Sequence, residues 1–136
     1  MGPLGYHAHV RKAVLLAVLL AGCAAAQRPS AGVEGPALAS REVLARFTSA
    51  VDEGRWPEAW ALLSARWRAR ETPERLAADL AASGPVGTSA VARAKAALAM
   101  GALPEVNGRS AALAVGQGKA AILLLEDGSW QVDALE

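Results

Sequence analysis

Reactive side chains are almost absent from this chain beyond its first 23 residues. The 136 residues include one cysteine (Cys23), one tyrosine (Tyr6) and two histidines (His7 and His9), so none of these types follows Cys23. The rest of the chain lacks the commonest general base, the commonest zinc ligands and every thiol nucleophile. It also cannot form an internal disulfide. We therefore expect no metal, no cofactor and no catalytic residue.

Large apolar side chains and an excess of charge are lacking as well. Alanine accounts for 33 of the 136 residues, beside four tryptophans and one phenylalanine. Since large rings bury the most area, we expect a thin core that depends on the tryptophans and leucines. Without Arg11 and Lys12, which lie in the N-terminal segment, the 14 basic residues become 12 against 13 acidic ones, a net charge of −1. This balance gives no reason to expect nucleic acid as a partner.

The first 22 residues have the plan of an export signal. Arg11-Lys12 precedes the nine-residue apolar run Ala13–Ala21. A membrane-spanning helix needs about 20 residues, so this length fits a signal peptide and not a permanent anchor. The alternatives are an ordinary signal peptide that leaves a cysteine nearby by chance, or a buried apolar helix.

The end of this segment, Leu20-Ala21-Gly22-Cys23, resembles the lipobox of bacterial lipoproteins. The resemblance implies that the Cys23 thiol carries diacylglycerol, that the chain is cleaved before Cys23, and that its amine often receives a further acyl chain. Two or three chains hold a protein on a membrane, whereas one anchors it only marginally. Because Ala24 and not aspartate follows Cys23, the resemblance favours the periplasmic face of an outer membrane if the cell has one.

The chain after the signal divides into a linker and one domain. Residues 23–39 have two prolines, two glycines and no apolar periodicity, so they are expected to form a flexible tether. Residues 40–136 are expected to form one α+β domain, with N-terminal helices packed on a C-terminal curved antiparallel sheet.

Helices are expected in the first part of this domain, over residues 40–53, 57–64, 73–82 and 89–100. Ser40 is the expected N-cap of the first helix, which ends at Gly54. Thr72 is the expected N-cap of the third helix, with Pro73 at the first helical position. Ser83-Gly84-Pro85 is expected to end that helix.

The pattern changes at Leu103 to short apolar segments, which predict strands near residues 103–106, 109–115, 119–126 and 129–134. Asn107-Gly108, Gly116-Gln117-Gly118 and Asp127-Gly128 separate them and are typical of hairpin turns. Ile122–Leu125 is continuously apolar, so its strand is expected to be central and covered on both faces.

Two stretches resemble nuclear transport factor 2-like domains, which belong to the ketosteroid isomerase-like superfamily. Asp52–Ser64 is similar to the join between the first two helices of these domains, and Glu126–Val132 to their closing hairpin. The resemblance covers residues 40–136 and implies helices around a curved sheet that enclose a cone-shaped space, shortened here because the strands are short. Many secreted or lipid-anchored bacterial members look like non-catalytic modules.

Isomerase-like relatives use a pocket aspartate as base, with a tyrosine or protonated acid as oxyanion donor. No tyrosine follows residue 23. The four aspartates suit structural positions instead: Asp52 a helix end, Asp79 a polar helix face, Asp127 a turn and Asp133 the outer face of the last strand. An isomerase-like enzyme is therefore the least favoured hypothesis.

Arg66, Arg68 and Arg70 surround Trp67 and are candidate contacts for anionic lipid headgroups. The alternative is a connecting loop in which Trp67 packs on the core and the arginines pair with Glu71 and Glu74.

Four tryptophans are candidate contacts for a cavity or a partner, unless they simply fill the core: Trp56, Trp60, Trp67 and Trp130. The expected function is a lipid-anchored envelope protein with a non-catalytic binding or scaffolding domain, whose partner the sequence does not identify and which could be a protein of the envelope. The alternative is a carrier of a small apolar ligand in a cavity between helices and sheet.

Overall fold

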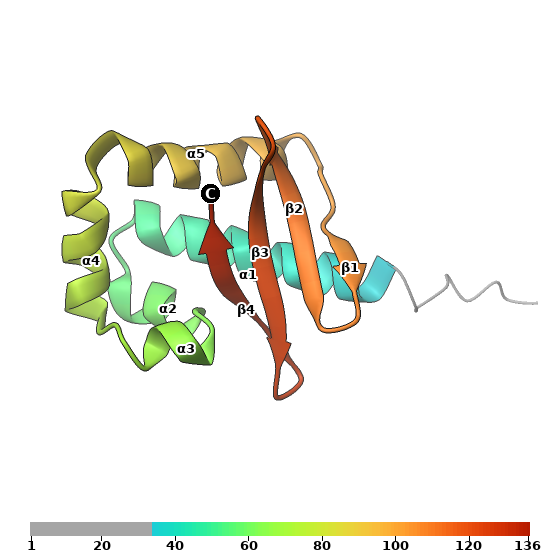
Figure 1. Ribbon diagram of the computed structural model, residues 1–136, viewed down its shortest axis with the longest axis horizontal. Helices are drawn as coiled ribbons and strands as arrows, with labels where there is room; N and C mark the ends of the chain where they lie inside the picture. Colours follow the sequence, from blue (N-terminus) through green and yellow to red (C-terminus); the bar gives the residue numbers. More distant parts are fainter. Residues whose placement is uncertain (1–33) are drawn as a thin grey trace, which may run out of the picture.

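The structure, a computed structural model, describes residues 34–136 (Figure 1). Five helices come first: α1 (Glu34–Asp52), α2 (Trp56–Ala61), α3 (Ala65–Arg68), α4 (Pro73–Ala82) and α5 (Gly84–Ala99). Four strands follow: β1 (Glu105–Asn107), β2 (Ser110–Gly116), β3 (Lys119–Glu126) and β4 (Ser129–Leu135). This order confirms the predicted α+β class. The expected signal peptide, Cys23 and residues 23–33 of the expected tether lie outside the described residues.

The strands form one antiparallel sheet in the order β1-β2-β3-β4, each joined to the next by a tight turn. At the last two turns the predicted residues provide the required backbone angles. The first turn is formed by Gly108 and Arg109 and not by the predicted Asn107-Gly108, because Asn107 belongs to β1 and pairs with Ser110. Asp127 and Gly128 both have positive φ, 48° and 78°, and so do Gln117 and Gly118, 57° and 72°. Two-residue hairpins of type I′ need positive φ at both central positions. Local sequence thus sets the connectivity of the sheet, as predicted.

One face of the sheet is buried and the other is partly exposed. The buried side chains alternate along the strands, as expected for a sheet packed on one side, and include Ala111, Leu113, Val115, Ala121, Leu123, Trp130 and Val132. In Figure 1 the strands lie in front of α1, with α5 at the upper end of the sheet. The prediction that β3 is central is confirmed, but its coverage on both faces is wrong, because Ile122 and Leu124 on the outer face are only partly buried.

A bulge interrupts β4 and changes the direction of one side chain. Leu123 of β3 pairs with Val132, whereas the preceding Ile122 pairs with Ala134, so Asp133 is the extra residue. A bulge bends the strand and redirects the extra side chain. The prediction that Asp133 lies on the outer face of the strand is therefore wrong: it is buried.

The free edge of β4 is covered by the segment after α2. The Ser64 N–H donates to the Val132 carbonyl, and the Val132 N–H donates to the Leu62 carbonyl, both over 2.8 Å. Leu63 thereby forms a parallel bridge with Val132. These bonds replace helical ones, so α2 ends at Ala61 and not at Ser64.

Two helices begin earlier than predicted. α1 starts at Glu34 because Pro36 lies in the first turn, where a missing N–H leaves no helical bond unmade. Ser40 is consequently not an N-cap but a buried residue whose Oγ donates to the Ala37 carbonyl over 2.9 Å. Residues 34–39 of the expected tether therefore belong to α1.

α5 starts at Gly84, not near residue 89, and follows α4 directly. Gly84 has a φ of 51°, which lets the chain turn sharply between the two helices. Gly87 lets α5 lie close to α4, since an added Cβ would lie 3.4 Å from Leu80 Cδ2 of α4 and 2.9 Å from the Ser83 Cβ between the two helices. The predicted start of α4 is confirmed: Thr72 Oγ1 accepts from the Arg75 N–H over 3.2 Å.

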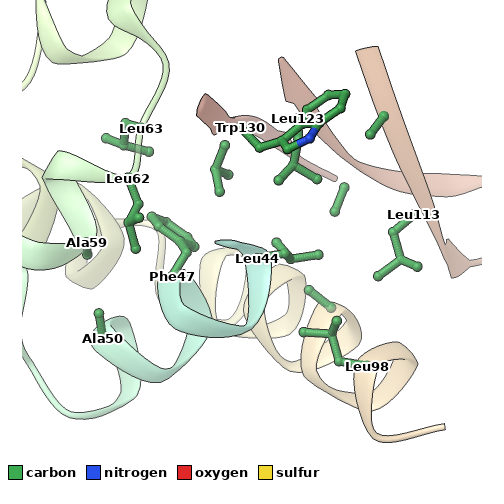
Figure 2. Close-up of a cluster of buried hydrophobic side chains, with 14 of the residues drawn as sticks. Leu44, Phe47, Ala50, Ala59, Leu62, Leu63, Leu98, Leu113, Leu123 and Trp130 are labelled. Carbon is green, nitrogen blue, oxygen red and sulfur yellow. The ribbon is translucent and has the colours of Figure 1, made fainter. Parts of the chain in front are cut away.

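The core lies between α1, α2, α5 and the inner face of the sheet. Figure 2 shows Leu44 and Phe47 of α1 facing the sheet, with Leu98 of α5 beside them and Leu123 and Trp130 on the sheet. Several members are alanines, including those at positions 50, 59, 94, 111 and 121. The core depends on leucines as predicted, but of the four tryptophans only Trp130 is buried.

Candidate functional site

A cleft of about 430 Å³ lies between the C-terminal part of β4 and the helices α3, α4 and α5. Figure 1 shows the elements that line it: the chain end of β4 lies between α5 above and α3 below, with α4 at the left. Its apolar lining comes from every one of these elements and from α1: Phe47, Leu63, Trp67, Leu76, Leu80, Val86, Ala90, Val91, Val132, Ala134 and Leu135. This volume and this mainly apolar lining are typical of sites for small organic molecules.

Charged residues also line the cleft: Glu71, Asp79, Arg93, Lys119, Asp133 and Glu136. The Arg93 Nε donates to the Glu136 carbonyl over 3.3 Å. Within residues 34–136, Glu71 Oε2 is the one buried side-chain nitrogen or oxygen that has no hydrogen-bond partner. From the sequence, Glu71 was expected only to pair with the arginines. Its place in the cleft was missed because no residue pattern near Glu71 indicates a cleft.

Hydrogen bonds through its own N–H and its own carbonyl hold the backbone of Glu71 in place. Its N–H donates to the Trp67 carbonyl over 2.8 Å, and its carbonyl accepts from Trp60 Nε1 over 2.6 Å. The next residue, Thr72, caps α4. The backbone of Glu71 is thus fixed between α3 and α4.

Asp133 joins α3 to β4 by the densest set of polar contacts near the cleft. Its Oδ1 accepts from Ser64 Oγ over 2.7 Å and from Arg66 Nε over 2.6 Å, and its Oδ2 accepts from Arg66 Nη2 over 2.7 Å. Its carbonyl accepts from Trp67 Nε1 over 2.6 Å. Bidentate pairing of this kind combines charge with fixed geometry.

These contacts decide the protonation state of Asp133. Burial acts to raise the pKa of its carboxyl, but the hydrogen bonds from Arg66 and Ser64 and the Arg66 charge outweigh burial, so the pKa lies below its usual value. Both oxygens of the carboxylate are occupied by these donors. Asp133 is therefore a structural anion that holds α3 on the sheet, and its geometry does not suit a general base.

The arginine segment forms a short helix and not the expected loop. Arg66 pairs with Asp133, and its guanidinium carbon lies 5.5 Å from the centre of the Trp67 ring. Arg68 Nη1 donates to the Leu63 carbonyl over 2.8 Å and to Gln131 Oε1 over 3.2 Å. The alternative in which these two arginines pair with Glu71 and Glu74 is wrong. Arg66 pairs with Asp133, which the bulge brings within reach, and Arg68 donates to carbonyl and amide oxygens. Arg70 is exposed.

The four candidate tryptophans do not meet at one site. Trp67 lines the cleft, and Trp60 packs against the core and holds the Glu71 carbonyl. Trp56 lines a hollow of about 500 Å³ between α1, α4 and α5. Trp130 borders another, of about 530 Å³, near the start of α1. Trp130 is thus a core residue and Trp60 packs against the core, whereas contact of Trp56 or Trp67 with a ligand or partner stays a prediction.

The other two hollows offer less to a ligand. In the hollow beside Trp56, the charged residues Asp52 and Lys95 pair with each other. The hollow beside Trp130 is lined without a charged side chain: Gly35, Pro36, Ala39, Val106, Gly108, Leu125 and Trp130. Only the cleft between α4, α5 and β4 combines an apolar lining with a buried polar atom that lacks a partner, among the residues the structure describes.

The remaining aspartates occupy the structural positions predicted for them. Asp52 ends α1, Asp79 lies exposed on α4 at the rim of the cleft, and Asp127 is in the β3–β4 turn. In the part of the chain from residue 34 onward, no three histidine, cysteine, aspartate or glutamate side chains gather as metal ligands. None of the helices in that part is long and apolar enough to cross a membrane.

Comparison of the chain with protein-family models, with curated proteins and with solved structures found no match. The cleft and its residues therefore carry the functional argument alone.

Proposed function

We propose that this chain is a lipid-anchored envelope protein whose domain binds a small, largely apolar molecule in the cleft without transforming it. The cleft is the observation that carries the proposal. Its lining joins core residues such as Phe47 and Val132 to partly exposed ones on α4 and α5, so a bound molecule would contact the core directly. This choice favours the carrier hypothesis over a scaffold for a protein partner, which stays a prediction.

The same proposal includes a fold of the nuclear transport factor 2-like type. Three features support it: helices that precede an antiparallel meander, a cleft between them, and the positions of the two resembling stretches. Asp52–Ser64 spans the join of α1 and α2, and Glu126–Val132 spans the β3–β4 turn. We propose binding and not isomerase chemistry because Asp133, the buried aspartate of the cleft lining, is committed to Arg66 and Ser64.

Thermal unfolding of the full chain tests ligand binding. A neutral probe, 4-phenylbutanol, is expected to raise the melting temperature in a saturable way, because a molecule that binds only the folded state stabilises it by mass action. At ten times its dissociation constant, the stabilisation is about 1.4 kcal/mol.

A matched pair of variants separates binding in the cleft from binding elsewhere. Ala90→Phe places a ring in the cleft lining, whereas Ala96→Phe places the same ring on the exposed side of α5. Ala90→Phe is expected to abolish the stabilisation by the probe and Ala96→Phe to preserve it. Equal responses of the two variants would show that the probe binds outside the cleft.

The anchor is tested in the native host by metabolic labelling with a fatty-acid probe. We expect the label on the wild-type chain and not on Cys23→Ser, which should leave the membrane fraction. An unlabelled wild-type chain would refute the anchor and leave the binding proposal untouched.

A further inference from the structure

The buried oxygen of Glu71 is the strongest indication of what the cleft binds. A polar atom that is buried without a hydrogen bond is uncommon in a folded protein and costs free energy. Glu71 Oε2 is in this position, and Glu71 lines the cleft. A carboxylate accepts hydrogen bonds and donates none. The missing partner is therefore a donor.

Four donor side chains of α2 and α3 are already used. The Arg66 guanidinium is engaged by both oxygens of Asp133, and Arg68 donates to the Leu63 carbonyl and to Gln131. The Trp60 and Trp67 indole N–H groups donate to the carbonyls of Glu71 and Asp133. Hydrogen bonds through its N–H and its carbonyl fix the backbone of Glu71 at the cleft.

Charge in the cleft favours a cation. The acidic side chains that line it are Glu71, Asp79, Asp133 and Glu136, and the basic ones are Arg93 and Lys119. Arg66 compensates Asp133 from outside the lining. Three carboxylates then face two cations, and one of the carboxylates has a buried oxygen without a partner.

We propose that the cleft takes a molecule with an apolar body and a protonated amine, and that the amine donates to Glu71. This inference rests on the proposed function. The apolar body lies against residues such as Phe47, Leu80 and Val132, and the amine lies beside Glu71 and the Trp67 ring. A charge-assisted hydrogen bond in a site sheltered from water gives the amine its advantage over a neutral molecule of the same shape.

Three probes with one skeleton test the proposal on the full chain: 4-phenylbutylamine, 4-phenylbutanol and 4-phenylbutyrate at neutral pH. We expect the amine to bind at least about tenfold more tightly than the alcohol, and the carboxylate to bind most weakly. Equal binding of amine and alcohol overturns the inference and leaves the proposed function intact. If none of the three binds, the proposed function fails and the inference fails with it.

Variants then assign the preference to one carboxylate. Glu71→Gln should reduce the preference for the amine to within about threefold and leave the affinity for the alcohol unchanged. Glu74→Gln, a control on the exposed side of α4, should keep the full preference. If Asp79→Asn removes the preference and Glu71→Gln does not, the assignment to Glu71 is overturned. If Glu71→Gln does not fold, the ranking of the three probes on the wild-type chain still decides whether the cleft selects an amine.

Discussion

α1 and α4 are both amphipathic helices of this domain, but they contribute to its core very differently. α1 places Leu44, Phe47 and Ala50 in the buried core, and Leu44 is 0% exposed. No residue of α4 is buried, and its apolar residues Leu76 and Leu80 line the cleft instead. We call α1 and the sheet the frame, which is tightly packed. We call α4 and the first half of α5 the cover, which is loosely packed. A binding site that must admit a ligand needs such a cover.

The largest difference between the two helices is expected when the same leucine-to-alanine substitution is made once in each. Leu44→Ala removes a fully buried side chain and should lower the free energy of unfolding by about 3 kcal/mol. Leu80→Ala, at a partly exposed position, should lower it by about 1 kcal/mol or less. Urea denaturation measures both. Similar losses in the two variants would contradict the division into frame and cover.

The second test concerns the contact that joins α3 to the frame. Asp133→Asn removes the charge from a buried carboxylate that accepts three hydrogen bonds, and should lower the free energy of unfolding by about 2 kcal/mol. Asp127→Asn, in a turn position with positive φ that asparagine tolerates, should change it little. If Asp133→Asn were as stable as the wild-type chain, α3 would be held on the sheet by its backbone hydrogen bonds alone.

The same contact predicts how stability depends on pH. The pKa of Asp133 is lower in the folded chain than the usual value of 3.8, so the folded state favours the ionised form. Its contribution to stability is present above about pH 4 and is lost as the pH falls below that. Between pH 5 and pH 3, the wild-type chain should therefore lose more stability than Asp133→Asn. Parallel pH profiles of the two would contradict the role of this carboxylate.

The smallest expected effect is a difference in local unfolding between α4 and the strands. In native-state hydrogen exchange, the amides of α4 should exchange at a lower free energy of opening than those of β2 and β3. No residue of α4 is buried, so little apolar surface becomes exposed to solvent when this helix detaches. An amine that binds beside Glu71 should bring the opening free energy of α4 closer to that of the strands, because the ligand contacts both the cover and the frame. Exchange of α4 only through global unfolding would show that the cover is as firmly held as the frame.

Local features of the fold could be predicted from the sequence, and those that depend on distant residues could not. Thr72 caps α4, and glycine-containing pairs make the last two turns, because the responsible atoms lie within a few residues of each other. The contacts of Asp133 with Ser64 and Arg66 span 69 and 67 residues and depend on a bulge that no local pattern marks. Alternation of apolar residues even placed Asp133 on the wrong face.

The candidate site shows the same limit. Trp67 was named in advance because a large ring is conspicuous in an alanine-rich chain. The role of Glu71 was missed, since its buried oxygen results from the packing of α3, α4 and β4 around it. The prediction for Ser40 was wrong for a related reason. A serine before an apolar helix suits an N-cap, but Pro36 is compatible with the first turn of a helix that starts six residues earlier, at Glu34.

The pairing of Leu63 with Val132 has a consequence for behaviour at high concentration. Sheets with long bare edges recruit strands from other molecules and polymerise. Here the β4 border of the sheet is bridged at Val132 by the chain's own backbone, and β1 at the opposite border has only three residues. Many copies crowded together should consequently stay separate, and removing the segment that guards β4 should expose the protein to aggregation.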